Sequence, residues 1–87
     1  MKSERYLKSK VSGSPYQPGQ QVKVVDAIDI EIHDVSMHIG KTGVTKALYY
    51  PNESGYPSDP IVVVEFLDGS GEGFWPEEIT PLVILVA

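Results

Sequence analysis

The side chains best suited to metal chemistry are two histidines and an aspartate. His33, Asp34 and His38 lie close together in the sequence, and imidazole nitrogen with carboxylate oxygen is a donor set that suits zinc. Their spacing matches no recognised metal-binding motif, and the ligand spacing of such motifs is strict. We therefore interpret the three as polar loop residues, and we predict no metal and no cofactor.

Nucleophilic catalysis requires an activated cysteine or serine with a base within reach. The chain has no cysteine, and no serine has the Gly-x-Ser-x-Gly setting of a nucleophile elbow. The GKTG segment at residues 40–43 lacks the glycine spacing and the following helix of a phosphate-binding loop. Because no acid–base–nucleophile set can be assembled, we predict that the protein is not an enzyme.

Aromatic side chains are the better functional candidates. Three tyrosines, Tyr49, Tyr50 and Tyr56, lie in the proline-rich segment 49–60, and Trp75 precedes another proline. Tyrosine and tryptophan supply large contact areas with few rotatable bonds, and tryptophan is enriched at binding hot spots. We predict that these four residues form a partner-binding surface. For Trp75, a purely structural role, packed beneath the long loop, is an equally favoured alternative.

Short β-strands must position these residues. Apolar alternation, β-branched residues and flanking glycine or proline indicate strands at five places. These are residues 21–27, 44–48, 61–67, 73–75 and 82–86. Asp68-Gly69 is a hairpin signal, and Pro76 is suited to start a single helical turn before the last strand. One inward face per strand predicts a core of Val22, Val24, Val44, Val62, Val64, Phe66, Phe74, Ile79 and Leu82.

Two further segments have a less regular pattern. Ile28, Ile30 and Ile32 alternate with charged residues, which indicates an extended arm that continues from the first strand. Residues 1–19 are polar, contain glycine and proline, and lack a hydrophobic period, so we expect a flexible N-terminal tail. With 87 residues in all, the chain is long enough for one domain, which we place at residues 20–87.

The order of these segments resembles that of the SH3-like barrels. The matching segments are QVKVVD, GKTGVTKAL, PIVVVEFLDG, GFWPEEI and TPLVIL. Their spacing also resembles small accessory subunits of photosynthetic electron transfer, namely the variable chain of ferredoxin–thioredoxin reductase and the ferredoxin-docking subunit of photosystem I. The resemblance covers roughly residues 20–82. It implies an all-β fold, a small five-stranded SH3-like antiparallel barrel with one short helical turn before the last strand, and a scaffolding role beside another subunit.

Charge and composition limit the partners and the cellular location. The net charge is −5, and from residue 44 onward Lys46 is the only cation among seven acidic residues. Binding to a phosphate backbone needs clustered lysine and arginine, so we predict no nucleic-acid binding. The absence of cysteine favours a reducing cytoplasm. The apolar run at residues 81–87 is shorter than a membrane span, and the first ten residues lack the apolar core of a secretory signal.

These observations predict a non-catalytic protein–protein interaction module, an accessory or scaffolding subunit of a larger assembly. Its acidic surface favours a protein partner with a neutral or basic surface. A regulatory barrel that binds a small ligand or a peptide stays open as an alternative. A nucleic-acid-associated barrel that uses the basic N-terminal residues is a second alternative. A homodimer through the apolar segment 82–86 also stays open.

Overall fold

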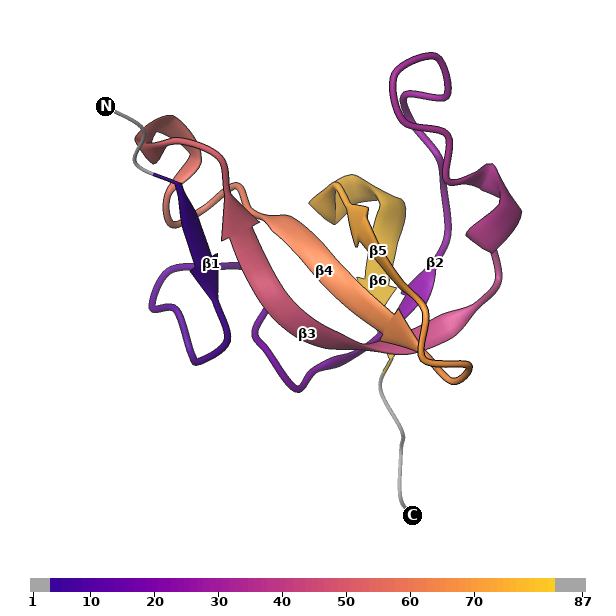
Figure 1. Ribbon diagram of the computed structural model, residues 1–87, viewed down its shortest axis with the longest axis horizontal. Helices are drawn as coiled ribbons and strands as arrows, with labels where there is room; N and C mark the ends of the chain where they lie inside the picture. The colour runs from indigo at the N-terminus through magenta and orange to yellow at the C-terminus, as the bar shows by residue number, and fades with distance from the viewer. Residues whose placement is uncertain (1–3, 83–87) are drawn as a thin grey trace.

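The computed structural model describes residues 4–82, which form an antiparallel sheet joined by single-turn helices (Figure 1). The strands are β1 (Arg5–Leu7), β2 (Gln21–Val24), β3 (Thr42–Tyr50), β4 (Ile61–Phe66), β5 (Gly71–Phe74) and β6 (Ile79–Pro81). The 3-10 helices are η1 (Ser36–His38), η2 (Glu53–Gly55) and η3 (Pro76–Glu78). The predicted all-β class is confirmed, and a short helical turn does precede the last described strand.

The sheet has six strands, in the order β5-β4-β3-β2-β6, with β1 also paired to β3. β3 is nine residues long, so one of its edges pairs with β2 near Val44 and with β1 near Tyr49, while β4 covers the other edge. The described sheet is open, whereas the sequence predicts five strands closed into a barrel. The additional strand, β1, comes from the segment that the sequence predicts to be a tail.

The hydrophobic core lies on the inner face of the curved sheet. Val62 and Val64 are fully buried and Val63 is partly exposed, which confirms the predicted register of β4. Val44 and Leu82, both predicted in the core, are 43% and 38% exposed. Thr45 is the inward-facing residue at this point of β3, and strand alternation therefore turns Val44 outward.

The N-terminal segment packs against the sheet from its first described residues, contrary to the predicted flexible tail. β1 pairs with the end of β3, and Val11 and Tyr16 are only 4% and 7% exposed. The Gln17 side chain accepts a hydrogen bond from the Val11 N–H at 2.7 Å and donates to the Val11 carbonyl at 2.6 Å. Such contacts between side chain and backbone order a chain that has no hydrophobic period. Residues 1–3 lie outside the described part of the chain.

Tyr16 connects this segment to the far end of the chain. Its hydroxyl donates a hydrogen bond to the Ile79 carbonyl at 3.0 Å. Burial, with a smaller contribution from the negative charge of Glu77, raises the pKa of Tyr16. The hydroxyl therefore keeps its proton and remains a donor at neutral pH.

The predicted arm at residues 28–32 is an irregular, turn-containing segment between β2 and η1. Ile28, Ile30 and Ile32 are 52%, 60% and 81% exposed. The His33 N–H donates to the Asp29 carbonyl at 2.8 Å and closes a turn here. The alternating pattern fails because the segment has no neighbouring strand to pair with in the described structure. The sequence predicts a last strand at residues 82–86. Residues 83–87 lie outside the part of the chain that the structure describes.

Over residues 4–82, no helix combines the length and the apolar character needed to cross a membrane.

Tyr16→Phe is expected to lower the free energy of unfolding by about 1–3 kcal/mol, because it removes the donor to a carbonyl that lies beside the core. Urea denaturation measures the change. The matched control is Tyr6→Phe, since Tyr6 is 48% exposed and exposed substitutions usually change stability by less than about 0.5 kcal/mol. Equal, small effects of the two substitutions would contradict a stabilising role for the N-terminal segment.

Candidate functional site

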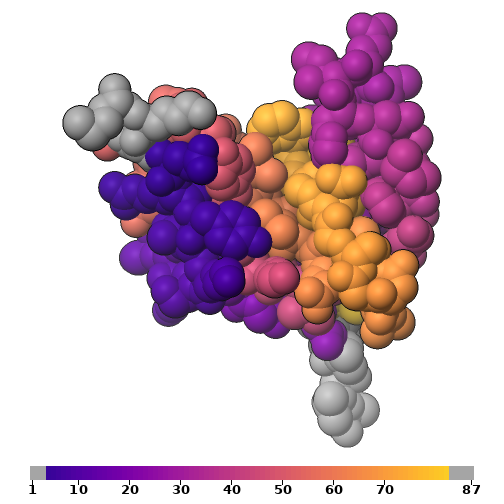
Figure 2. Space-filling model, viewed as in Figure 1, coloured from indigo at the N-terminus to yellow at the C-terminus, as the bar shows by residue number. Residues whose placement is uncertain are grey.

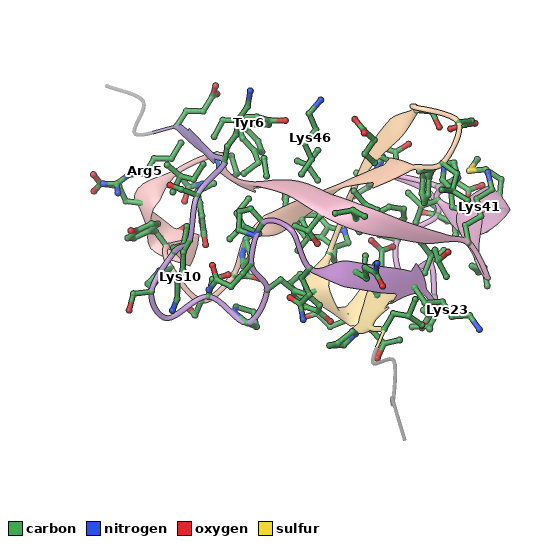
Figure 3. The ribbon with its side chains drawn as sticks, turned by 90° about the horizontal axis from the view of Figure 1, so that it is seen from below. Arg5, Tyr6, Lys10, Lys23, Lys41 and Lys46 are labelled. Atoms are coloured by element: carbon green, nitrogen blue, oxygen red, sulfur yellow. The ribbon has the colours of Figure 1, made fainter. Side chains whose placement is uncertain are left out.

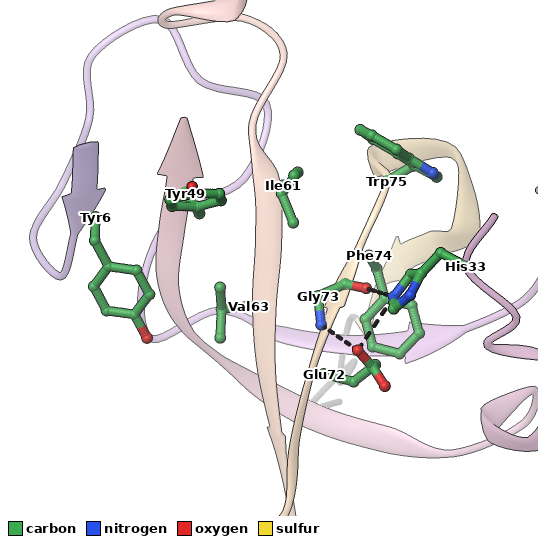
Figure 4. A pocket seen from close by; sticks show the side chains of 9 residues that line it. All are labelled: Tyr6, His33, Tyr49, Ile61, Val63, Glu72, Gly73, Phe74 and Trp75. Atoms are coloured by element: carbon green, nitrogen blue, oxygen red, sulfur yellow. Dashed lines mark hydrogen bonds and ion pairs between the residues drawn. The ribbon is translucent and has the colours of Figure 1, made fainter. Parts of the chain in front are cut away.

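A groove of about 480 Å³ crosses the outer face of the sheet between the N-terminal segment and β5 with its following turn (Figure 2). Nine residues line it: Tyr6, His33, Tyr49, Ile61, Val63, Glu72, Gly73, Phe74 and Trp75 (Figure 4). Most of these side chains are apolar or aromatic, with a few polar groups among them. A concave surface of this composition is typical of a binding site.

The floor of the groove is the outer face of β4. Ile61 and Val63 lie there, alternating with the buried residues of the same strand. On the neighbouring strand, a Cβ added at Gly73 would lie only 2.9 Å from Cγ2 of Ile61. The glycine therefore lets the Ile61 side chain extend over β5, and no side chain of residue 73 fills the groove at this point.

Aromatic residues form the two walls. On one side, the Tyr6 and Tyr49 rings lie 6.4 Å apart and are tilted by 53°. The Tyr49 hydroxyl donates a hydrogen bond to Glu4 Oε2 at 3.0 Å, and this bond raises the pKa of Tyr49. Trp75, partly exposed, stands on the opposite side of Ile61 (Figure 4). The groove is therefore bounded by large side chains that remain accessible.

The four aromatic residues predicted to form one surface are divided by the structure. Tyr49 and Trp75 line the groove, but Tyr50 is fully buried, because strand alternation places it on the opposite face from Tyr49. The Tyr50 hydroxyl donates to the Pro57 carbonyl at 2.9 Å. Tyr56 packs edge-on against Tyr50, with ring centroids 5.0 Å apart, and lies outside the groove.

His33 and Glu72 meet at the edge of β5 (Figure 4). His33 Nε2 lies 3.0 Å from the Gly73 carbonyl oxygen and 3.2 Å from Glu72 Oε1. The Gly73 N–H donates to the same carboxylate oxygen at 3.1 Å. The main-chain donor and acceptor of Gly73 are thus both satisfied by side chains.

The second histidine, His38, lies near the other carboxylate oxygen of Glu72. His38 Nε2 lies 3.8 Å from Glu72 Oε2, and the ring stacks on Phe66 with centroids 4.9 Å apart. Lys41 Nζ lies 3.2 Å from His38 Nδ1. Because an ammonium can only donate, Nδ1 accepts this bond and the ring proton resides on Nε2, toward the carboxylate.

The residues considered as metal ligands do not converge. Asp34 Oδ1 accepts a hydrogen bond from the Ser36 N–H at 2.9 Å, and hydrogen bonding by Ser36 lowers the pKa of Asp34. The histidines are directed at Glu72 instead, and Lys41 places a cation beside His38. Within residues 4–82, no three or more of the histidine, aspartate and glutamate residues are grouped so as to hold a metal ion.

A buried carboxylate connects the two elements that flank the groove near β5. The side chain of Glu78 is fully buried. Its Oε1 accepts a hydrogen bond from the Trp75 N–H at 2.8 Å, and its Oε2 accepts one from the Ile28 N–H at 3.0 Å. A buried N–H that lost such an acceptor would be left unsatisfied at a cost of about 1–3 kcal/mol. Glu78 therefore fixes Trp75 and the start of the loop that carries His33.

Several residues of the groove were missed by the sequence analysis. The sequence does contain a signal for Ile61 and Val63, because an unbroken IVVV run is typical of a strand that is covered on both faces. No sequence signal pointed to Tyr6, since it lies in a polar segment that lacks a hydrophobic period. Glu72 and His33 are far apart in the sequence, and only the fold brings them together.

Comparisons with protein-family models, curated proteins and solved structures find no match to this chain.

Glu78→Ala is expected to lower the free energy of unfolding by about 3 kcal/mol or more, because two backbone N–H groups lose their acceptor. Urea denaturation followed by Trp75 fluorescence measures the change. The adjacent Glu77 is exposed, so Glu77→Ala is the matched control and should change stability by less than about 0.5 kcal/mol. If both variants unfold like the wild type, Glu78 does not hold the two elements together.

Proposed function

We propose that the protein is a non-catalytic protein–protein interaction module, an accessory or scaffolding subunit that binds a segment of its partner in this groove. The observation that carries the proposal is the apolar outer face of β4, with Ile61 and Val63 between the aromatic side chains of Tyr49 and Trp75. The outer face of a small antiparallel sheet is usually polar, and an apolar hollow on a surface is typical of an interaction site.

The charges around the groove favour a neutral or basic partner. Glu4 and Glu72 lie beside it, and one cation, Lys8, has its Nζ 5.9 Å from the centroid of the Tyr6 ring. The labelled cations in Figure 3 are spread along the molecule rather than gathered into one patch, with Lys46 between the two ends. Lys46 also pairs with Glu65 at 3.5 Å. This distribution supports a protein partner over a nucleic acid, whose binding depends on clustered cations.

The resemblance to SH3-like barrels and to accessory subunits of photosynthetic electron transfer is part of this proposal. Strands β2 to β6 and the turn η3 follow the order of segments on which that resemblance depends. The order supports a role beside another subunit. We also propose a cytoplasmic location, on the basis of the cysteine-free composition.

Selection of random peptides by display on the wild-type protein tests the proposal. We expect the selected peptides to combine aromatic or aliphatic residues with lysine or arginine. Trp75→Ala should weaken their binding by about 2 kcal/mol or more, the range of a hot spot, and leave the protein folded. Tyr56→Ala removes an aromatic residue outside the groove, and it should leave affinity unchanged.

Two results would contradict the proposal. The first is that the selected peptides bind Trp75→Ala and the wild type equally. The second is that Trp75→Ala lowers stability by about 3–5 kcal/mol, as expected for a buried aromatic residue, and leaves the affinity of the folded protein unchanged. Trp75 would then be a structural cap.

A further inference from the structure

We propose that the bound segment is an extended strand that adds to the open edge of β5, and that its main chain replaces His33 and Glu72 at Gly73. This inference rests on the proposed function, and it specifies the conformation and composition of the segment that the groove binds. Strand addition obtains affinity from main-chain hydrogen bonds and specificity from alternate side chains.

The register of the β4–β5 hairpin identifies the groups at the open edge. The Phe66 N–H donates to the Ser70 carbonyl at 2.8 Å, so this opposed pair is hydrogen-bonded. Hydrogen-bonded and non-hydrogen-bonded pairs alternate along an antiparallel ladder. The pairs of β4 with Gly71 and with Gly73 are therefore of the non-hydrogen-bonded kind. Both glycines direct their N–H and C=O groups away from β4, toward the edge.

Side chains occupy the positions at Gly73 that a neighbouring strand would take. The Glu72 carboxylate accepts from the Gly73 N–H, and the His33 ring lies within hydrogen-bonding distance of the Gly73 carbonyl. These side chains are 30% and 43% exposed, so both are free to turn toward solvent. Among residues 4–82, the edge groups of Gly71 make no hydrogen bond. An incoming strand would pair at Gly71 directly and at Gly73 after displacement.

The two glycines also leave the surface of β5 between the sheet edge and the groove free of side chains. Neither Gly71 nor Gly73 carries a side chain on the face of β5 that continues the groove floor. Alternate apolar side chains of an added strand can therefore extend across β5 to Ile61 and Val63. Aromatic or β-branched residues are best suited to such contacts across a sheet.

The charge at the edge specifies the other residues of the ligand. Displacement takes His33 and the Gly73 N–H from the Glu72 carboxylate. Only the more distant His38 Nε2, 3.8 Å from Oε2, then remains beside it, and a further cationic or hydrogen-bonding partner would be accommodated. The hairpin adds the exposed acidic residue Asp68, whose Oδ1 accepts hydrogen bonds from Ser70 and which has the cation Lys41 nearby. Lysine or arginine between the apolar positions would supply such a partner for Glu72. We therefore identify the ligand class as an extended peptide in which apolar and basic residues alternate.

The test uses the full chain and a short capped peptide of alternating valine and lysine. Two control peptides have the same sequence and charge, one with N-methyl groups on the valine amides and the other on the lysine amides. Only one of the two sets of amides faces β5 in an added strand, because successive N–H groups point to opposite sides. We expect one methylated peptide to lose at least about tenfold in affinity, or 1.4 kcal/mol, and the other to bind like the parent.

Two further measurements follow the edge itself. The Gly71 amide should exchange its hydrogen more slowly when the parent peptide is bound, in native-state exchange measured by NMR. His33→Ala should bind the parent peptide several-fold more tightly, because no side chain then has to leave the Gly73 carbonyl. Weaker binding by this variant would show that His33 holds the ligand, and it would overturn the displacement.

The remaining outcomes separate this inference from the proposed function. If both methylated peptides bind like the parent and Trp75→Ala abolishes binding, strand addition is overturned and the groove still binds a partner. If the alternating peptide does not bind although display-selected peptides do, the ligand class is wrong and the proposed function stands. If Gly71 becomes protected as protein concentration rises without peptide, and sedimentation shows a dimer, the edge binds a second copy and the inference is overturned.

Discussion

The groove near β5 depends on one buried carboxylate. Removing a carboxylate from water costs several kcal/mol unless hydrogen bonds satisfy it, and both oxygens of Glu78 accept backbone N–H groups. The carbonyl of the same residue accepts from Val25 and Asp26 at 2.8 and 3.2 Å. One residue thus connects η3 to the loop that follows β2. Trp75 and His33, which flank the groove at this end, take their positions from these two elements.

The groove combines an apolar floor, aromatic walls and polar groups at the edge of β5. β4 is apolar on both faces from Ile61 to Val64, so one face builds the core and the other forms the floor of the groove. The glycines of β5 place no side chain beside the floor of the groove, while the side chains of Tyr49 and Trp75 form its walls. The polar groups at this site, His33 and Glu72, bond to each other and to the main chain. They occupy the edge of β5 at Gly73, and side chains at a sheet edge are one way in which proteins limit unwanted pairing.

The sequence predicts local features of this fold well. The run from Ile61 to Phe66, the hairpin after it and the inward position of Val64 all follow from alternation and turn chemistry. Prediction fails where hydrogen bonds between distant residues decide the conformation. Residues 28–32 alternate like a strand, yet their loop is held by Glu78 and by its own turn. The N-terminal segment is polar and still ordered, because Tyr16 and Gln17 bond to backbone groups.

Native-state amide hydrogen exchange at Ile28 and Trp75 tests most directly whether Glu78 holds the groove in shape. These are the two N–H groups that its carboxylate accepts. If they stay bonded until the protein unfolds, both amides exchange with a free energy close to that of global unfolding. Exchange of either amide at the rate of an unstructured peptide would contradict the account, because the residues beside the groove would then be free to move in the folded protein.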